Sequence, residues 1–166
     1  MARLRHALQE IVPAHVTTKV HINRLYWMAL LHFLAMYALM YAMVDRFSNV
    51  YLNLNTFYMA GLMTTPMLIL EGLLMGAMYH NTKALVAVMA AGAVLFVAFF
   101  VFIRQQTAIR DRAFLRSMIP HHAGAILMCE KASLEDAEIR NLCGSIVQSQ
   151  QSEIDQMKGI LRRLAE

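Results

Sequence analysis

Soft metal-binding side chains are concentrated in one short stretch of the sequence, MIPHHAGAILM. The stretch and the residue that follows it contain Met118, His121, His122, Met128 and Cys129. Thioether, imidazole and thiol groups are the ligands that favour Cu(I) and related soft ions over Mg²⁺ or Ca²⁺. The stretch therefore indicates a site for a soft transition-metal ion.

The spacing within this stretch limits which side chains can share one ion. On a helix, Met118 can lie on the same face as either His121 or His122, because residues three and four apart are neighbours. The adjacent histidines point ~100° apart and are not expected to bind one ion equally. Met128 lies ~10 Å further along the axis than His121, at ~1.5 Å per residue. The pattern predicts two sites, or one site completed by a partner helix.

Three long apolar runs precede this stretch, at residues 25–44, 57–79 and 84–103. Each reaches the ~20 residues that a helix needs to cross a ~30 Å hydrocarbon layer. Because apolar residues make up 58% of the chain, we predict an integral membrane protein in contact with lipid, with a three-span region over residues 25–103. Residues 1–24 form a basic segment without the apolar core of a cleavable signal peptide.

Residues 104–166 are predicted to form a helical hairpin domain. The first helix is expected to continue outward from the third span over residues 104–132, with a kink, a restart or a plain joint at Pro120. The second helix is expected over residues 134–164. The pattern Ser133-x-x-Asp136 is typical of a helix start. The predicted fold class is thus all-α.

An antiparallel hairpin brings residues of its two helices together. The predicted register sets Cys129 opposite Cys143, His121 and His122 near residues 150–151, and Met157 about one turn from Met118. The two cysteines are a disulfide, a thiolate pair or two buried apolar residues, and we favour a role other than metal ligation. Vicinal histidines are also common as exposed polar residues, and methionines on a helix face as core.

The formal net charge of +4 does not indicate a nucleic-acid partner. The basic residues flank the apolar runs, where such residues meet anionic lipid head groups and set topology. Five lie on each side of the predicted membrane region. Three spans place the termini on opposite faces, but this even distribution leaves the orientation open.

The C-terminal part of the sequence also carries a wider pattern. It comprises Asp111, Phe114-Leu115, Met118-Ile119-Pro120-His121-His122, Gly124-Ala125-Ile126, Met128, Glu138-Ile139-Arg140, Gln151, Glu153-Ile154 and Met157. Over roughly residues 108–164 the sequence resembles the bacterial domain-of-unknown-function 305 family.

The resemblance implies a ferritin-like helical fold and association with copper. It implies Cu(I) or Ag(I) binding by five side chains, those of Met118, His121, His122, Met128 and Met157. It also implies a periplasmic C-terminal hairpin, which would place the protein in a bacterial inner membrane with a cytoplasmic N-terminus.

The sequence departs from the family pattern in three ways. Ala123 stands where members often have Gln, Cys129 and Cys143 are additional, and there is one hairpin where many secreted members have four helices. A two-helix hairpin buries little surface. We therefore expect a homo-oligomer formed through the hairpin, or packing against another membrane subunit.

The first two apolar runs hold further soft ligands at intervals of four residues. The first run contains Met28, His32, Met36 and Met40, and the second contains Met59, Met63, Met67 and Glu71. An ionisable residue at membrane depth is a functional candidate. Pro66 is expected to break the helix of the second run and to free the carbonyl of Leu62. One hypothesis is a soft-metal relay through His32, Met36, Met63, Met67 and Glu71. The other is that methionine fills helix interfaces while Glu71 bonds to His32 or a threonine.

No enzyme signature is present. The sequence has no Glu-x-x-His pair of a di-iron bundle and no nucleophile elbow or Gly-rich cofactor loop. We expect a non-enzymatic, membrane-anchored Cu(I) or Ag(I) binding protein for metal tolerance, storage or delivery, with a membrane or periplasmic copper protein as a partner. The alternative is an accessory structural subunit of a larger membrane complex without its own metal.

Overall fold

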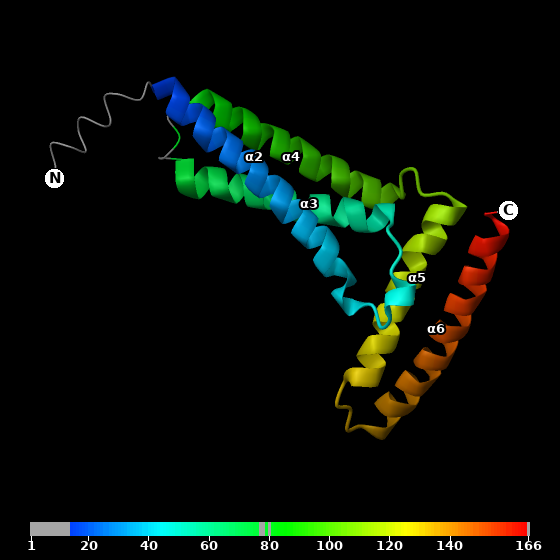
Figure 1. Ribbon diagram of the computed structural model, residues 1–166. Helices are drawn as coiled ribbons and strands as arrows, with labels where there is room; N and C mark the ends of the chain where they lie inside the picture. Colours follow the sequence, from blue (N-terminus) through cyan, green and yellow to red (C-terminus); the bar gives the residue numbers. More distant parts are fainter. Residues whose placement is uncertain (1–13, 77–78, 80, 166) are drawn as a thin grey trace. The chain divides into compact units, whose positions relative to one another are not determined.

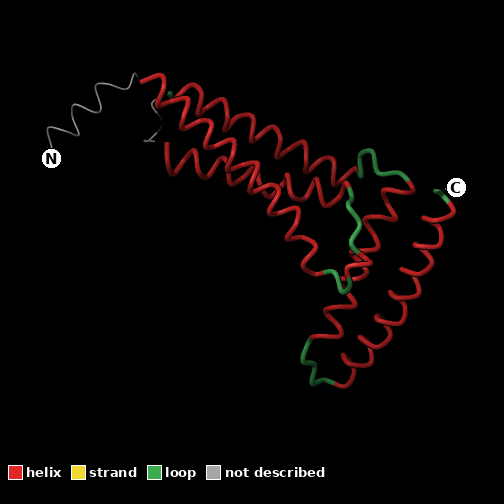
Figure 2. Tube along the Cα trace, in the orientation of Figure 1, coloured by secondary structure: helices red, strands yellow, loops and turns green. Residues whose placement is uncertain are grey.

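The computed structural model describes residues 14–76, 79 and 81–165, and these residues form helices without any strand (Figures 1 and 2). The α-helices are α2 (Ala14–Leu39), α3 (Leu54–Met75), α4 (Thr82–Gln105), α5 (Asp111–Lys131) and α6 (Ala137–Arg163). Two short 3-10 helices, η1 (Met40–Met43) and η2 (Phe47–Asn49), lie between α2 and α3. The all-α prediction is confirmed for the described residues. Most of the basic segment 1–24 lies outside them.

The chain divides into two compact units. The bundle unit contains the described residues up to Met36 together with Ala60–Val101, and the hairpin unit contains Tyr37–Met59 and the residues from Phe102 on. The predicted hairpin domain began at residue 104 and did not include the segment 37–59. This segment becomes part of the candidate site described below.

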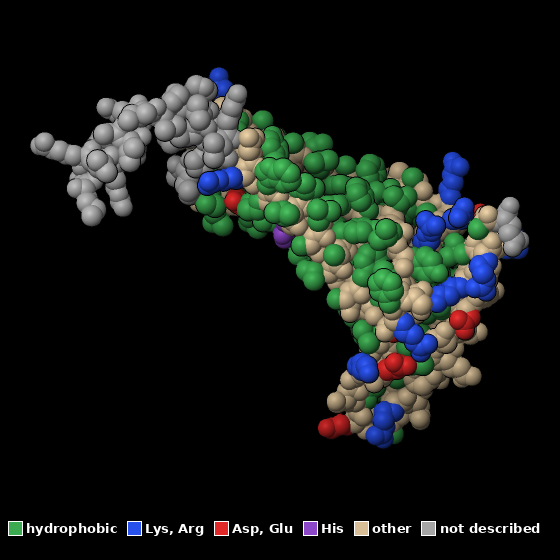
Figure 3. All heavy atoms as spheres, in the orientation of Figure 1, with side chains coloured by type: hydrophobic (Ala, Val, Ile, Leu, Met, Phe, Trp, Pro, Cys, Tyr) green, Lys and Arg blue, Asp and Glu red, His purple; other side chains and the backbone are tan. Residues whose placement is uncertain are grey.

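Three helices are long and apolar enough to cross a membrane. They cover Ile22–Met43, Leu54–Met75 and Thr82–Gln105, and they correspond in order to the predicted spans. Many of their large apolar side chains are exposed, and hydrophobic side chains cover the face of these helices seen in Figure 3. Such a surface requires an apolar environment or apolar partners.

Close helix packing in the bundle unit depends on small residues. A β-carbon at Gly61 would lie 2.5 Å from the ring of Phe99, so glycine allows α3 and α4 to approach each other. Pro66 lies inside the continuous helix α3. The hydroxyl of Thr65 donates to the carbonyl of Leu62 over 3.3 Å. The expected break of the helix at Pro66 is therefore wrong. Proline has no N–H to donate to the Leu62 carbonyl, and the Thr65 side chain donates to this carbonyl instead.

The two helices of the hairpin unit bury a shared apolar core. Its members are Leu115, Ile119, Ala123 and Ile126 on α5 and Ile154 and Met157 on α6. The α5 members recur at three- and four-residue intervals, so they form one face of the helix. A disulfide joins Cys129 to Cys143, which agrees with the predicted register.

The first hairpin helix does not continue from the third long helix as predicted. Helix α4 ends at Gln105 and α5 begins at Asp111. Between them, Gln106 and Ala108 have φ angles of 50° and 60°, a left-handed conformation that a right-handed helix of L-residues does not contain. The Gln106 and Asn55 side-chain amides exchange two hydrogen bonds of 3.1 Å, so tertiary contacts stabilise the turn.

The second hairpin helix begins later than predicted. Asp136 is its N-cap, and the carboxylate accepts hydrogen bonds from the backbone N–H groups of Glu138 and Ile139 over 2.8 and 3.0 Å. Ser133 lies in the preceding turn. Pro120 lies inside α5, which continues through it without a restart.

Candidate soft-metal site

A pocket of about 550 Å³ lies between α5 and the segment 40–59, within the hairpin unit. The residues lining it include one imidazole and five thioether side chains, those of His121, Met40, Met43, Met59, Met118 and Met128. Its other lining residues are apolar or uncharged and polar, such as Val44 and Asn53. The pocket lining therefore contains neither a carboxylate nor a Lys or Arg side chain.

The structure brings together three of the five side chains that were predicted as metal ligands. Met118, His121 and Met128 line the pocket. His122 and Met157 do not line it, because they are buried in the interface between α5 and α6. The cysteines Cys129 and Cys143 form the disulfide and line a separate, smaller pocket.

Both ring nitrogens of His122 are hydrogen-bonded. Nδ1 lies 2.9 Å from the backbone oxygen of Met118, and Nε2 lies 2.7 Å from Oε2 of Glu153. A carbonyl and a carboxylate both accept hydrogen bonds, so the ring satisfies both partners when each nitrogen carries a proton. The partner on α6 is Glu153, and not residues 150–151 as predicted.

Glu153 is held as a carboxylate by two donors. The hydroxyl of Ser149 donates to Oε1 over 2.9 Å, and His122 contacts Oε2. These hydrogen bonds, with that of Ser149 the larger cause, lower the pKa of Glu153 below its usual value. The His122–Glu153 contact therefore joins α5 to α6 as an ion pair when the imidazole is protonated.

His121 is in the opposite situation. It is exposed, and neither of its ring nitrogens makes a hydrogen bond within the described part of the chain. The planes of the two histidine rings are inclined at 64°, with centroids 6.2 Å apart. As the helical spacing predicted, the adjacent histidines face different surroundings, and the nitrogen lone pair of His121 is available to a ligand.

The segment that forms the opposite wall of the pocket is held against α5 at two points. Asn53 caps the start of α3 by accepting from the backbone N–H of Thr56 over 2.8 Å, and its Oδ1 lies 3.3 Å from Oγ of Ser117 on α5. At the second point, a β-carbon placed at Gly124 would lie 3.4 Å from the backbone oxygen of Met43.

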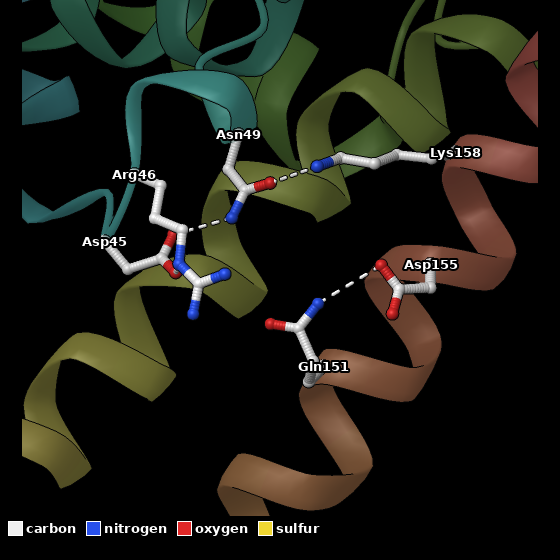
Figure 4. Close-up of polar contacts among 6 residues, drawn as sticks. All are labelled: Asp45, Arg46, Asn49, Gln151, Asp155 and Lys158. Atoms are coloured by element: carbon white, nitrogen blue, oxygen red, sulfur yellow. Dashed lines mark hydrogen bonds and ion pairs between the residues drawn. The ribbon is translucent and has the colours of Figure 1, made fainter.

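The same segment is joined to α6 through Asn49, whose side chain is held by a buried carboxylate (Figure 4). The Asp45 side chain is only 3% exposed, and its Oδ1 accepts from Nδ2 of Asn49 over 2.6 Å. Lys158 of α6 donates to Oδ1 of Asn49, and Nε of Arg46 lies 3.3 Å from the second oxygen of Asp45. Because Asp45 is only two residues from Met43, these contacts also restrain the backbone at Met43 in the pocket wall.

The residues of the hypothetical relay are only partly brought together. Met63, Met67 and Glu71 line a groove of about 400 Å³ along α3. His32 and Met36 lie on α2 and do not line this groove. Within the described ranges, no hydrogen bond joins Glu71 to His32 or to a threonine.

Two comparisons place the chain in a family. Residues 102–161 match the family described as domain of unknown function 305, DUF305. The chain is also 34% identical over 119 residues to uncharacterized protein L153 of Acanthamoeba polyphaga mimivirus, an alignment that covers 70% of this chain and 76% of that protein. The chain therefore belongs to the DUF305 family. No solved structure matches it.

The family match covers only one wall of the pocket. Helix α5 lies within residues 102–161, whereas Met40, Met43 and Met59 lie before them. In the sequence, Met40 and Met59 belong to stripes along two predicted spans, and Met43 lies near the end of the first stripe. They share a pocket with His121 only because the segment 37–59 folds against α5. Neither helix periodicity nor the family pattern predicts this packing.

Proposed function

We propose that this chain is a non-enzymatic, membrane-anchored protein that binds a soft monovalent metal ion, Cu(I) or Ag(I), for tolerance, storage or delivery. One observation supports this function best. Met118, His121 and Met128 converge on one pocket whose lining contains neither a carboxylate nor a Lys or Arg side chain. The copper association of the family, which the sequence resemblance implies, points to the same ion.

The chemistry of the lining favours a soft ion of low charge. Thioether sulfur and neutral imidazole nitrogen are preferred by Cu(I), whereas Ca²⁺ and Mg²⁺ require carboxylate or carbonyl oxygens. An uncharged ligand set also suits a monovalent ion, because a buried charge without counter-charge costs more free energy as its magnitude rises. The soft, uncharged donor atoms of the pocket would therefore select Cu(I) or Ag(I) over the common divalent ions.

The cellular setting is part of the same proposal. Insertion of the three apolar helices into lipid would cover their exposed apolar side chains. By the family resemblance, the hairpin would lie on the periplasmic side of a bacterial inner membrane, with the N-terminus cytoplasmic. Exposed apolar residues on the hairpin, such as Phe114, Ile139 and Leu142, are available for contact with a second copy or another copper protein.

The proposal is tested by titrating Cu(I) into the detergent-purified chain against a competing chelator. The variant M118L/H121A/M128L removes all the candidate donors of α5, and we expect the affinity to fall by at least about tenfold. The control is M28L/M89L, which removes two thioethers outside the pocket. The control should bind as the unchanged chain does.

The opposite result would favour a different function. If the unchanged chain binds neither Cu(I) nor Ag(I), the metal-binding proposal fails. Co-purification of the metal-free chain with other membrane subunits would then support the accessory structural role.

A further inference from the structure

We infer that Met40, Met43 and Met59 complete the ligand set for the soft monovalent ion, together with side chains of α5. The inference rests on the proposed function and adds a second element to the site. This element is the segment of the hairpin unit between the first and second long helices, which the family match does not include.

Helix α5 cannot complete a ligand set with its own thioethers. Met118 and Met128 are ten residues apart, which separates them by ~15 Å along the helix axis. Both sulfurs cannot reach one ion over that separation. The helix therefore offers His121 with one methionine at a time, and further donors must come from another element.

The segment 40–59 contacts α5 on both sides of His121. It contacts α5 through Asn53 at Ser117 and through Met43 at Gly124. These two points on α5 are seven residues and ~10 Å apart, and His121 lies between them. The methionines of the segment and His121 accordingly line the same pocket.

The backbone of Met43 lies close to Gly124. A β-carbon at Gly124 would lie 3.4 Å from the Met43 carbonyl oxygen and 3.9 Å from the Met43 β-carbon, which is van der Waals contact. Gly124 lies one helical turn from both His121 and Met128. Met43 thus contacts α5 between His121 and Met128.

Contacts within the hairpin unit hold this segment in place. The Asp45–Asn49–Lys158 contacts lie directly after Met43, and the Asn53 cap lies six residues before Met59. Donors on a backbone that is already ordered lose less conformational entropy on ligation, which raises affinity. The anchoring contacts therefore provide a physical reason for the thioethers of this segment to contribute.

The test compares two matched variants of the full-length chain in detergent. M40L/M43L/M59L removes three sulfur atoms while conserving side-chain volume and apolarity. We expect its Cu(I) affinity, measured against a competing chelator, to fall by at least about tenfold. X-ray absorption at the copper edge should show fewer sulfur neighbours. The control M28L/M89L should retain both the affinity and the sulfur count.

The two proposals fail in different ways. If M40L/M43L/M59L keeps the original affinity and sulfur count while M118L/H121A/M128L loses binding, this inference is overturned and the proposed function stands. If neither variant changes the affinity, the ion binds outside this pocket, and both this inference and the site assigned to the proposed function are overturned. Circular dichroism establishes that each variant is folded, and the single substitution Met43→Leu replaces the triple variant if the latter is not.

Discussion

The two faces of α5 meet the same kinds of side chain in opposite states. On the face toward α6, His122 is buried and both of its nitrogens are hydrogen-bonded, and Met157 of α6 packs into the shared core. On the pocket face, His121 and Met128 are exposed and line an open cavity. The two adjacent histidines have the same chemistry, but they differ in their surroundings because only His122 has hydrogen-bond partners on both nitrogens within the described residues.

This difference separates stability from binding. Side chains toward α6 exchange water for protein partners during folding, so their loss should weaken the fold. Side chains toward the pocket keep their lone pairs, so their loss should weaken ligand binding and leave the fold intact. The comparison predicts distinct effects for substitutions that lie only one residue or one turn apart.

The largest stability effect is expected in the core between α5 and α6. Ile154 has no exposed surface. Ile154→Ala should lower the free energy of unfolding by about 2–5 kcal/mol, because apolar burial is lost and a cavity remains. The measurement is a urea titration in detergent followed by circular dichroism. The control Ile139→Ala lies on the exposed face of the same helix and should change stability by less than about 0.5 kcal/mol. Equal losses in the two variants would contradict the assigned core.

The adjacent histidines provide the sharpest comparison. His121→Ala should lower the Cu(I) affinity by at least about tenfold, with little change in the free energy of unfolding. His122→Ala should lower that free energy by about 1–3 kcal/mol, because it removes both hydrogen bonds of a buried ring, and should change the affinity little. The comparison fails if the folded His122→Ala variant loses as much affinity as His121→Ala.

The smallest effect is expected from Glu153. Its pKa is lowered by the hydrogen bonds from Ser149 and His122, so it favours the folded state while it is ionised. This contribution to stability is fully present above the ordinary glutamate pKa of 4.5. It is lost as the pH falls from 4.5 through the lower pKa that Glu153 has in the folded state. The thermal midpoint of the unchanged chain should therefore fall more steeply below about pH 5 than that of Glu153→Gln. Parallel profiles would show that the pair does not contribute to stability.

Several features were predictable because they depend on short stretches of chain. Apolar runs of about 20 residues predicted three long helices, and apolar periodicity predicted the hairpin and the opposition of Cys129 and Cys143. The separation of His121 and His122 followed from the ~100° turn per residue. The start of α6 was misplaced because Ser133 and Asp136 are both good capping residues.

The sequence by itself determined which donors this protein has and that they lie on helices, since composition and helical periodicity are local properties. Only the tertiary structure decided which donors meet. The turn at residues 106–110 depends on Asn55, which is distant in sequence. The pocket forms because the segment 37–59 packs on α5. Glu153 is hydrogen-bonded to His122, which leaves His121 as the histidine of the pocket. Contacts between distant segments are set by packing over the whole unit, and no local pattern encodes them.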